Sequence, residues 1–257
     1  MGDDIRVSRE DHVALVEFSR PPLNYFDAAL IGDLATALRT LDEDRDVRAV
    51  VLASSGKNFC AGADFTSGGN FEGGDLAGPL TQLYEAGIEL MRTRKPIVAA
   101  VQGAAVGGGC GLALVADFRV AGPGSRFTVN FARLGIHPGF GLTITLPRLV
   151  GEQKAAELFY TGRRIGGEEA LAIGLVDRLV PDGELRAAAL AFAREIAASA
   201  PLAVMSVRET LRLGRYEAIK ERLERELAEQ LWLRRTEDAE EGIRAVSERR
   251  DGRFVAG

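Results

Sequence analysis

The segment Ala104–Asp117, AAVGGGCGLALVAD, decides how we interpret the fold of this 257-residue chain. Its three consecutive glycines, Gly107 to Gly109, follow a strand-like apolar run, Ile97–Val101, and precede a helical apolar run that starts at Leu112. They therefore stand where a helix begins, and the free amides and dipole of a helix N-terminus favour negative charge. The segment predicts a backbone site for an anion such as a phosphate, a carboxylate or an enolate oxygen.

Glycine-rich segments also occur in nucleotide-binding loops, and the spacing here excludes the two common forms. The dinucleotide fingerprint needs G-x-G-x-x-G, and the phosphate loop needs G-x-x-x-x-G-K followed by Ser or Thr. Neither spacing is present in this segment. The alternative to an anion site is a structural role, in which the glycines only let a helix pack closely against a strand.

A second segment favours the anion site. Lys57–Phe65, KNFCAGADF, follows the apolar run Ala49–Ala53 and places small residues, Ala61 to Ala63, at a turn. Two separate strand ends would then each offer exposed amide groups.

Short apolar runs alternate along the chain with longer runs of helical periodicity, which predicts layered α/β structure. The expected strands are Ile5–Val7, Val13–Phe18, Ala49–Ala53, Ile97–Val101 and Phe118–Ala121, and the expected helices are Ala28–Leu41, Pro79–Arg92 and Gly109–Val115. After Pro201 the chain becomes a charged amphipathic helix whose Ile219, Leu223, Leu227 and Leu231 recur every four residues. This stripe packs either against the core of its own chain or against another subunit.

Composition is typical of one large domain or of a core with a small appendage, because 46% of the residues are hydrophobic and 27% are charged. A formal charge of -5 argues against binding to nucleic acid or to an anionic membrane. No apolar run approaches about 18 residues, and the N-terminus lacks a secretory pattern. The two cysteines, Cys60 and Cys110, have no disulfide-framework spacing. We therefore expect a cytoplasmic protein without a disulfide.

Seven motifs in order resemble those of the crotonase, or enoyl-CoA hydratase/isomerase, superfamily over nearly the whole chain. Besides the two segments above they are RPPLN at 20–24, KPIVAAVQG at 95–103, ADFRVAG at 116–122, LPRLVG at 146–151 and ALAIGLVDRLV at 170–180. The resemblance implies an α/β crotonase (ClpP-like) spiral of ββα units over residues 1–200. It also implies a C-terminal helical oligomerisation region over 201–257 that forms a homotrimer or a dimer of trimers.

The resemblance further implies an acyl-CoA thioester as substrate, with no metal and no cofactor other than the coenzyme A of that substrate. The amides of Ala63 and Gly108 would form an oxyanion hole for the enolate of the thioester. Coenzyme A would lie near Lys57, Ala61, Ala63, Phe65 and Phe254, and residues Thr66–Gly78 would form a loop over the site.

The sequence departs from the hydratase pattern at both positions where the family carries a catalytic glutamate. Gly111 and Phe131 stand there, so hydration should be poor. His137 and Tyr84 are the replacement acid/base candidates, although a local hydrogen bond would also explain His137 and core packing would also explain Tyr84. Tyr25 and Asn130 are weaker candidates.

Three functions remain open from the sequence. The first is an acyl-CoA enzyme of the hydratase/isomerase type with an altered acid/base set. The second is a crotonase-type decarboxylase or carbon–carbon hydrolase, and the third is a non-catalytic acyl-CoA binding protein.

Overall fold

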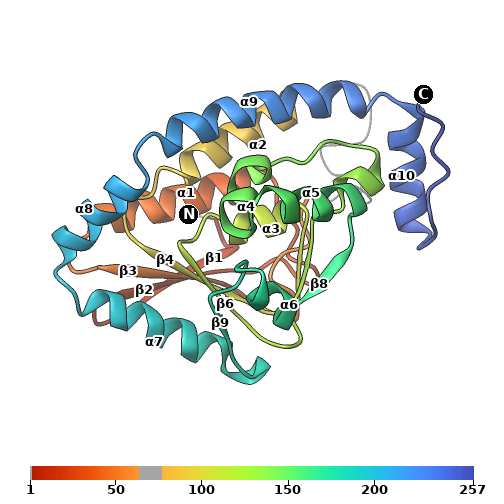
Figure 1. Cartoon of the computed structure of the whole chain (residues 1–257). Coiled ribbons are helices and arrows are strands. Elements are labelled where there is room, and N and C mark those ends of the chain that lie inside the picture. The colour runs from red at the N-terminus through yellow and green to blue at the C-terminus, as the bar shows by residue number, and fades with distance from the viewer. Residues whose placement is uncertain (1, 64–76) are drawn as a thin grey trace.

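The computed structural model describes residues 2–63 and 77–257 as a layered α/β structure (Figure 1). Its main sheet has the strand order β1-β2-β3-β4-β6-β9; β1 and β2 pair antiparallel, and every later pair is parallel. The strands are β1 (Ile5–Glu10), β2 (Val13–Phe18), β3 (Ala49–Ser54), β4 (Ile97–Val101), β6 (Phe118–Ala121) and β9 (Arg178–Leu179). Both β3 and β4 are buried throughout, as a central parallel strand requires.

Helices cover both faces of this sheet. The helix α7 (Leu185–Ala197) lies along one face and packs its alanines, such as Ala189 and Ala193, against β3 and β4 (Figure 1). The opposite face carries the larger core, which includes α1 (Ala28–Glu43) and α2 (Ala77–Leu90), and α9 (Arg215–Leu233) packs alongside α2.

A second, smaller sheet has the order β5-β7-β8, and the three glycines follow directly after its first strand, β5. It consists of β5 (Ala104–Val106), β7 (Arg126–Thr128) and β8 (Arg164–Gly166). The remaining elements are α3 (Gly108–Ala113), η1 (Phe131–Leu134), α4 (Leu142–Val150), α5 (Glu152–Thr161), α6 (Gly167–Ala172), η2 (Asp182–Glu184), α8 (Pro201–Leu211) and α10 (Glu237–Ser247).

The sequence predicted the strands of the main sheet up to β6 and the helices α1, α2 and α3 to within two residues, apart from the longer β1. It did not predict the small sheet, because three-residue strands carry no usable periodicity. Of the predicted loop Thr66–Gly78, residues 77 and 78 begin α2, and the remainder lies outside the described residues.

The amphipathic stripe of α9 packs against the core of its own chain. Ile219 and Leu223 are buried there, and Leu227 and Leu231 are partly buried against the same core. Both cysteines are free and buried, in agreement with the expected absence of a disulfide. Within residues 2–63 and 77–257, no single helix is long and apolar enough to cross a membrane, although η2–α7 and α8 together pass that test with a bend of 102°.

Candidate functional site

Two loops leave the main sheet at the same edge and then run side by side. Because β3 and β4 are parallel neighbours, with Val50 opposite Ile97, the segments after them emerge at one edge. The amide of Cys60 donates to the carbonyl of Ala104 at 3.0 Å, and the amide of Val106 donates to the carbonyl of Cys60 at 3.0 Å. The segment that ends at Ala63 is thus held against the strand that leads into α3.

Glycines permit the close approach of these two segments. Gly62 has φ +90°, and a Cβ added to it would lie 2.8 Å from the carbonyl oxygen of Val106. A Cβ on Gly109 would lie 2.7 Å from the carbonyl carbon of Cys60. Side chains at these positions would force the segments apart.

A buried asparagine fixes the loop that precedes Cys60. The Asn24 side-chain amide donates to the carbonyl of Ser55 at 2.7 Å and to the carbonyl of Asn58 at 2.8 Å. Its Oδ1 accepts from the amide of Arg20 at 2.7 Å, which holds the RPPLN turn itself. The asparagine of that motif therefore positions the segment that leads to Ala63.

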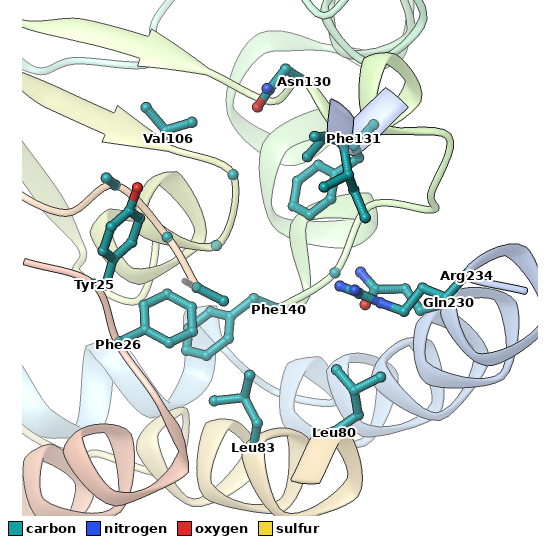
Figure 2. A pocket seen from close by; sticks show the side chains of 18 of the residues that line it. Tyr25, Phe26, Leu80, Leu83, Val106, Asn130, Phe131, Phe140, Gln230 and Arg234 are labelled. Atoms are coloured by element: carbon teal, nitrogen blue, oxygen red, sulfur yellow. The ribbon is translucent and has the colours of Figure 1, made fainter. Parts of the chain in front are cut away.

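Ala63 and Gly108 both line a cavity of about 350 Å³, shown in Figure 2. Among the described residues, neither amide has a hydrogen-bond acceptor. Gly108 is the first residue of α3, where an N–H group has no partner inside the helix. Two residues of the cavity wall thus have backbone amides without an acceptor in this part of the chain.

The walls of the cavity are largely apolar. Phe26 and Phe140 pack together with their ring centroids 5.1 Å apart, and Leu80 and Leu83 of α2 extend the same surface (Figure 2). Such a surface suits a hydrocarbon chain.

An aromatic ring packs against one expected glutamate position, Gly111, and occupies the other, Phe131. A Cβ on Gly111 would lie 3.1 Å from Cβ of Phe140, so the space that a longer side chain would need there is filled. Phe131 is 6% exposed, and its ring lies 3.5 Å from the place of a Cβ on Gly107.

The polar side chains of the cavity include no acid/base pair of the usual kind. They come from Tyr25, Tyr84, Asn130, Gln230, Arg234 and Ser247, and no Asp, Glu or His of residues 2–63 and 77–257 lines the cavity. The Tyr84 hydroxyl is buried without a hydrogen-bond partner in this part of the chain. Burial, with a contribution from nearby Glu226, raises the pKa of Tyr84, so its phenol keeps its proton at neutral pH.

The helix α9 holds the loop that forms one side of the cavity. Glu226, Gln230 and Arg234 follow one another at intervals of four residues and therefore share a helix face. The carboxylate of Glu226 accepts from the amide of Gly141 at 2.8 Å and from the amide of Thr143 at 3.0 Å. The side chain of Gln230 donates to the carbonyl of His137 at 2.8 Å.

Burial shifts the pKa of two side chains on this face, Glu226 and Arg234. It raises the pKa of Glu226 to about 7, although the donors of Thr143 and Gly141 act in the opposite direction. It lowers the pKa of Arg234 to about 10, which still leaves the guanidinium charged at neutral pH. Arg234 therefore brings a positive charge to a mainly apolar cavity (Figure 2).

The structure brings several of the expected site residues together. Ala61, Ala63, Gly108 and Tyr84 line the cavity, as do the weaker candidates Tyr25 and Asn130. Sequence reasoning missed Gln230 and Arg234. The four-residue spacing on α9 was the signal for both, since polar residues recur there on the inward face of an amphipathic helix.

Other expected site residues lie elsewhere. His137 does not line the cavity, and its Nδ1 lies 2.7 Å from the backbone oxygen of Pro138. Lys57 is exposed, and Phe254 is 46% exposed in the tail beyond α10. Phe65 lies outside the described residues. Among the residues that are described, no group of three or more His, Cys, Asp or Glu side chains is arranged to hold a metal ion.

Comparison with known proteins places these features in one family. The family model described as "Enoyl-CoA hydratase/isomerase" matches residues 8–256. A probable enoyl-CoA hydratase of Rhizobium meliloti is 39% identical over 258 residues, which cover 98% of each chain. The crystal structure of an enoyl-CoA hydratase/isomerase from Pseudoalteromonas atlantica superposes with a TM-score of 0.86 at 29% identity, covering 98% of this chain and 100% of the other. An enoyl-CoA hydratase structure from Bacillus anthracis gives a TM-score of 0.78 at 31% identity, covering 98% and 99%.

Proposed function

We propose, from the premise that this chain belongs to the enoyl-CoA hydratase/isomerase family of the crotonase superfamily, that the amides of Ala63 and Gly108 form an oxyanion hole for an acyl-CoA thioester. The observation that carries the proposal is that both residues line one cavity while neither amide has an acceptor among the described residues. Fixed donors of this kind stabilise an enolate by about 3 to 4 kcal/mol each. Developing charge on the thioester oxygen is thus the feature that the site accommodates.

The acyl group extends into the apolar cavity, and coenzyme A lies toward Ala61 at its rim. Lys57 is exposed on the same loop, where it is available to a phosphate, and Phe65 and Phe254 complete the proposed coenzyme A contacts. Coenzyme A enters as part of the substrate, and we assign no other cofactor.

The reaction is of the lyase or isomerase type, with an acid/base set that differs from a pair of glutamates. Gly111 and Phe131 offer no proton-transfer group, and the loss of positioned acids and bases costs about 10²- to 10⁴-fold in rate. Slow hydration of crotonyl-CoA is therefore expected. Tyr84 is the proton donor that best fits, since it is neutral and lines the cavity.

Arg234 favours a second candidate, the decarboxylation of a malonyl-type thioester. Its guanidinium lines the cavity and would hold the carboxylate that leaves. The bond between that carboxylate carbon and the α-carbon breaks, CO₂ departs, and the electron pair forms the thioester enolate at the two amides. The Tyr84 phenol then supplies the proton to the α-carbon and is reprotonated from water. The carbon–carbon hydrolase and the non-catalytic binding protein remain as alternatives.

We also propose a cytoplasmic homotrimer or dimer of trimers whose region 201–257 provides the subunit contacts, without nucleic acid or membrane as partner. Exposed apolar side chains on and after α8, such as Leu202, Leu211 and Leu213, are consistent with burial in such an assembly.

Turnover of crotonyl-CoA, a 3-enoyl-CoA and methylmalonyl-CoA by the purified protein tests these assignments. We expect weak hydration and a measurable loss of CO₂ from methylmalonyl-CoA. Tyr84→Phe should lower the rate on the active substrate by about 10²-fold or more. His137→Ala serves as the comparison, because His137 does not line the cavity. Full activity of Tyr84→Phe would exclude Tyr84 as the donor, and tight binding without any turnover would support the non-catalytic alternative.

A further inference from the structure

The turn between η1 and α4 carries Phe140 into the cavity that Ala63 and Gly108 line. Phe140 is 4% exposed and has φ +61°, and Gly141, the N-cap of α4, follows with φ +74°. The left-handed region is unfavourable for a residue with a Cβ, so a phenylalanine adopts it only where its surroundings impose it. The conformation of Phe140 therefore depends on the contacts of the turn with its neighbours.

Glu226 of α9 contacts the turn from outside. Its side-chain oxygens accept from the amide of Gly141 at 2.8 Å, from the amide of Thr143 at 3.0 Å and from the hydroxyl of Thr143 at 2.6 Å. The side chain is 0% exposed, and hydrogen bonds that are shielded from water are electrostatically stronger than exposed ones. Glu226 thus fastens the backbone directly after Phe140 to α9.

The ring of Phe140 occupies the side of the cavity next to α3. A Cβ on Gly111 would lie 3.1 Å from Cβ of Phe140, and a Cβ on Gly87 of α2 would lie 3.4 Å from its Cε2. The ring also packs on Phe26, with the centroids 5.1 Å apart. Phe26 in turn lies against Gly108, because a Cβ there would be 2.4 Å from Cζ of Phe26. The two rings form an aromatic wall that begins beside Gly108.

We propose, on the basis of the acyl-CoA function proposed above, that Phe140 sets the width of the cavity and that Glu226 acts through Phe140 as a positioning residue. An acyl group whose thioester oxygen meets the amide of Gly108 has its first carbons beside the wall of Phe26 and Phe140. Closely packed rings yield little, so extra methyl groups there cost binding. The site therefore takes an acyl chain that is unbranched beyond its α-carbon.

Two isomeric ligands, hexanoyl-CoA and 3,3-dimethylbutyryl-CoA, test the proposal, because their acyl groups have the same atoms and differ in width. Calorimetric titration of the full-length protein measures the affinity for each. We expect the wild type to bind hexanoyl-CoA about tenfold more tightly or better. Phe140→Ala opens the wall and should reduce this preference about tenfold. Phe192→Ala is the matched control, since this ring packs on α7, at the opposite face of the main sheet, and should leave the preference unchanged.

A double-mutant comparison tests whether Glu226 acts through the ring. Glu226→Ala should lower the preference about threefold or more in the wild type, but not in a protein that already carries Phe140→Ala. Glu221→Ala, an exposed change on the same helix, should leave the preference unchanged. Thr143→Val removes only the hydroxyl bond to Glu226, so it should act in the same direction even if Glu226→Ala does not fold.

The outcomes separate the role of Phe140 from the acyl-CoA function on which it depends. A wild type that binds neither ligand at millimolar concentration would overturn both. Equal binding of the two isomers by the wild type, or an unchanged preference in Phe140→Ala, would overturn the role of the ring while acyl-CoA binding stands. A preference that falls equally with and without Phe140→Ala would overturn the positioning role of Glu226.

Discussion

Glu226 offers the sharpest test of the electrostatics around the cavity that Ala63 and Gly108 line. Its carboxyl group is fully buried on α9, and burial raises its pKa from 4.5 to about 7. An acid with a raised pKa contributes stability while it is protonated, and that contribution is lost as the pH rises from 4.5 through about 7. The difference between these two pKa values corresponds to about 3 kcal/mol of unfolding free energy.

The change Glu226→Gln removes this titration and keeps the shape of a protonated carboxyl group. At about pH 5 the variant and the wild type should have similar unfolding free energies, because both side chains are then neutral or nearly so in the folded state. At about pH 8 the variant should be more stable by about 2 to 3 kcal/mol, since only the wild type then holds a buried carboxylate.

Urea unfolding at the two pH values measures this difference directly, and taking variant minus wild type cancels the titration of all other groups. Glu221→Gln, an exposed change on the same helix, is the matched control for the loss of a glutamate from α9. A Glu226→Gln protein that is less stable than the wild type at the higher pH would refute the reasoning. It would mean that Gly141 and Thr143 stabilise the ionised carboxylate more than burial penalises it.

Two further changes probe the backbone site and the altered glutamate position. Gly108→Ala would bring a methyl group to 3.0 Å from Cε1 of Phe26, so acyl-CoA turnover should fall by about 10²-fold through displacement of the site, as steady-state assays would measure. Gly32→Ala, where an added Cβ meets nothing within 4 Å, should leave turnover unchanged, and equal turnover in both variants would contradict the role of the amide. Gly111→Glu should lower the unfolding free energy by about 1 to 3 kcal/mol without a gain in crotonyl-CoA hydration, because Phe140 fills the space. A gain in hydration would mean that the ring moves aside for a functional carboxylate.

The sequence predicted the parts of the fold that depend on long apolar runs. Strand β4 is one uninterrupted hydrophobic run, and β3 is one up to its last residue, Ser54. The apolar stripe of α1 has helical spacing and follows the N-cap Asp27, so local pattern and tertiary burial agree. Strands β5, β7 and β8 escaped prediction because they are three residues long and gain their identity only from pairing with distant segments.

The candidate site was predictable in its backbone part and only partly in its side chains. The glycines around Gly108 carry a strong local signal, since only glycine tolerates the approach of Gly109 to Cys60. Arg234 lies far along the chain from these residues, and the four-residue spacing on α9 marks an inward face without indicating which cavity that face meets. His137 was a candidate because it is close in sequence to Phe131, yet sequence proximity does not fix the direction of a loop.

In the proposed site, backbone amides would stabilise the enolate, whereas side chains would transfer protons. A change of side chains can therefore alter the reaction while the amide donors stay in place. The amide donors come from the path of the chain, and the ladder between Cys60 and β5 holds that path independently of any acid or base. Substitution at Gly111 or Phe131 therefore leaves the proposed oxyanion site intact and alters only the groups that move protons. Phe140 belongs to the side-chain part of this division, because its ring packs on Gly111 and adds apolar surface to the cavity wall.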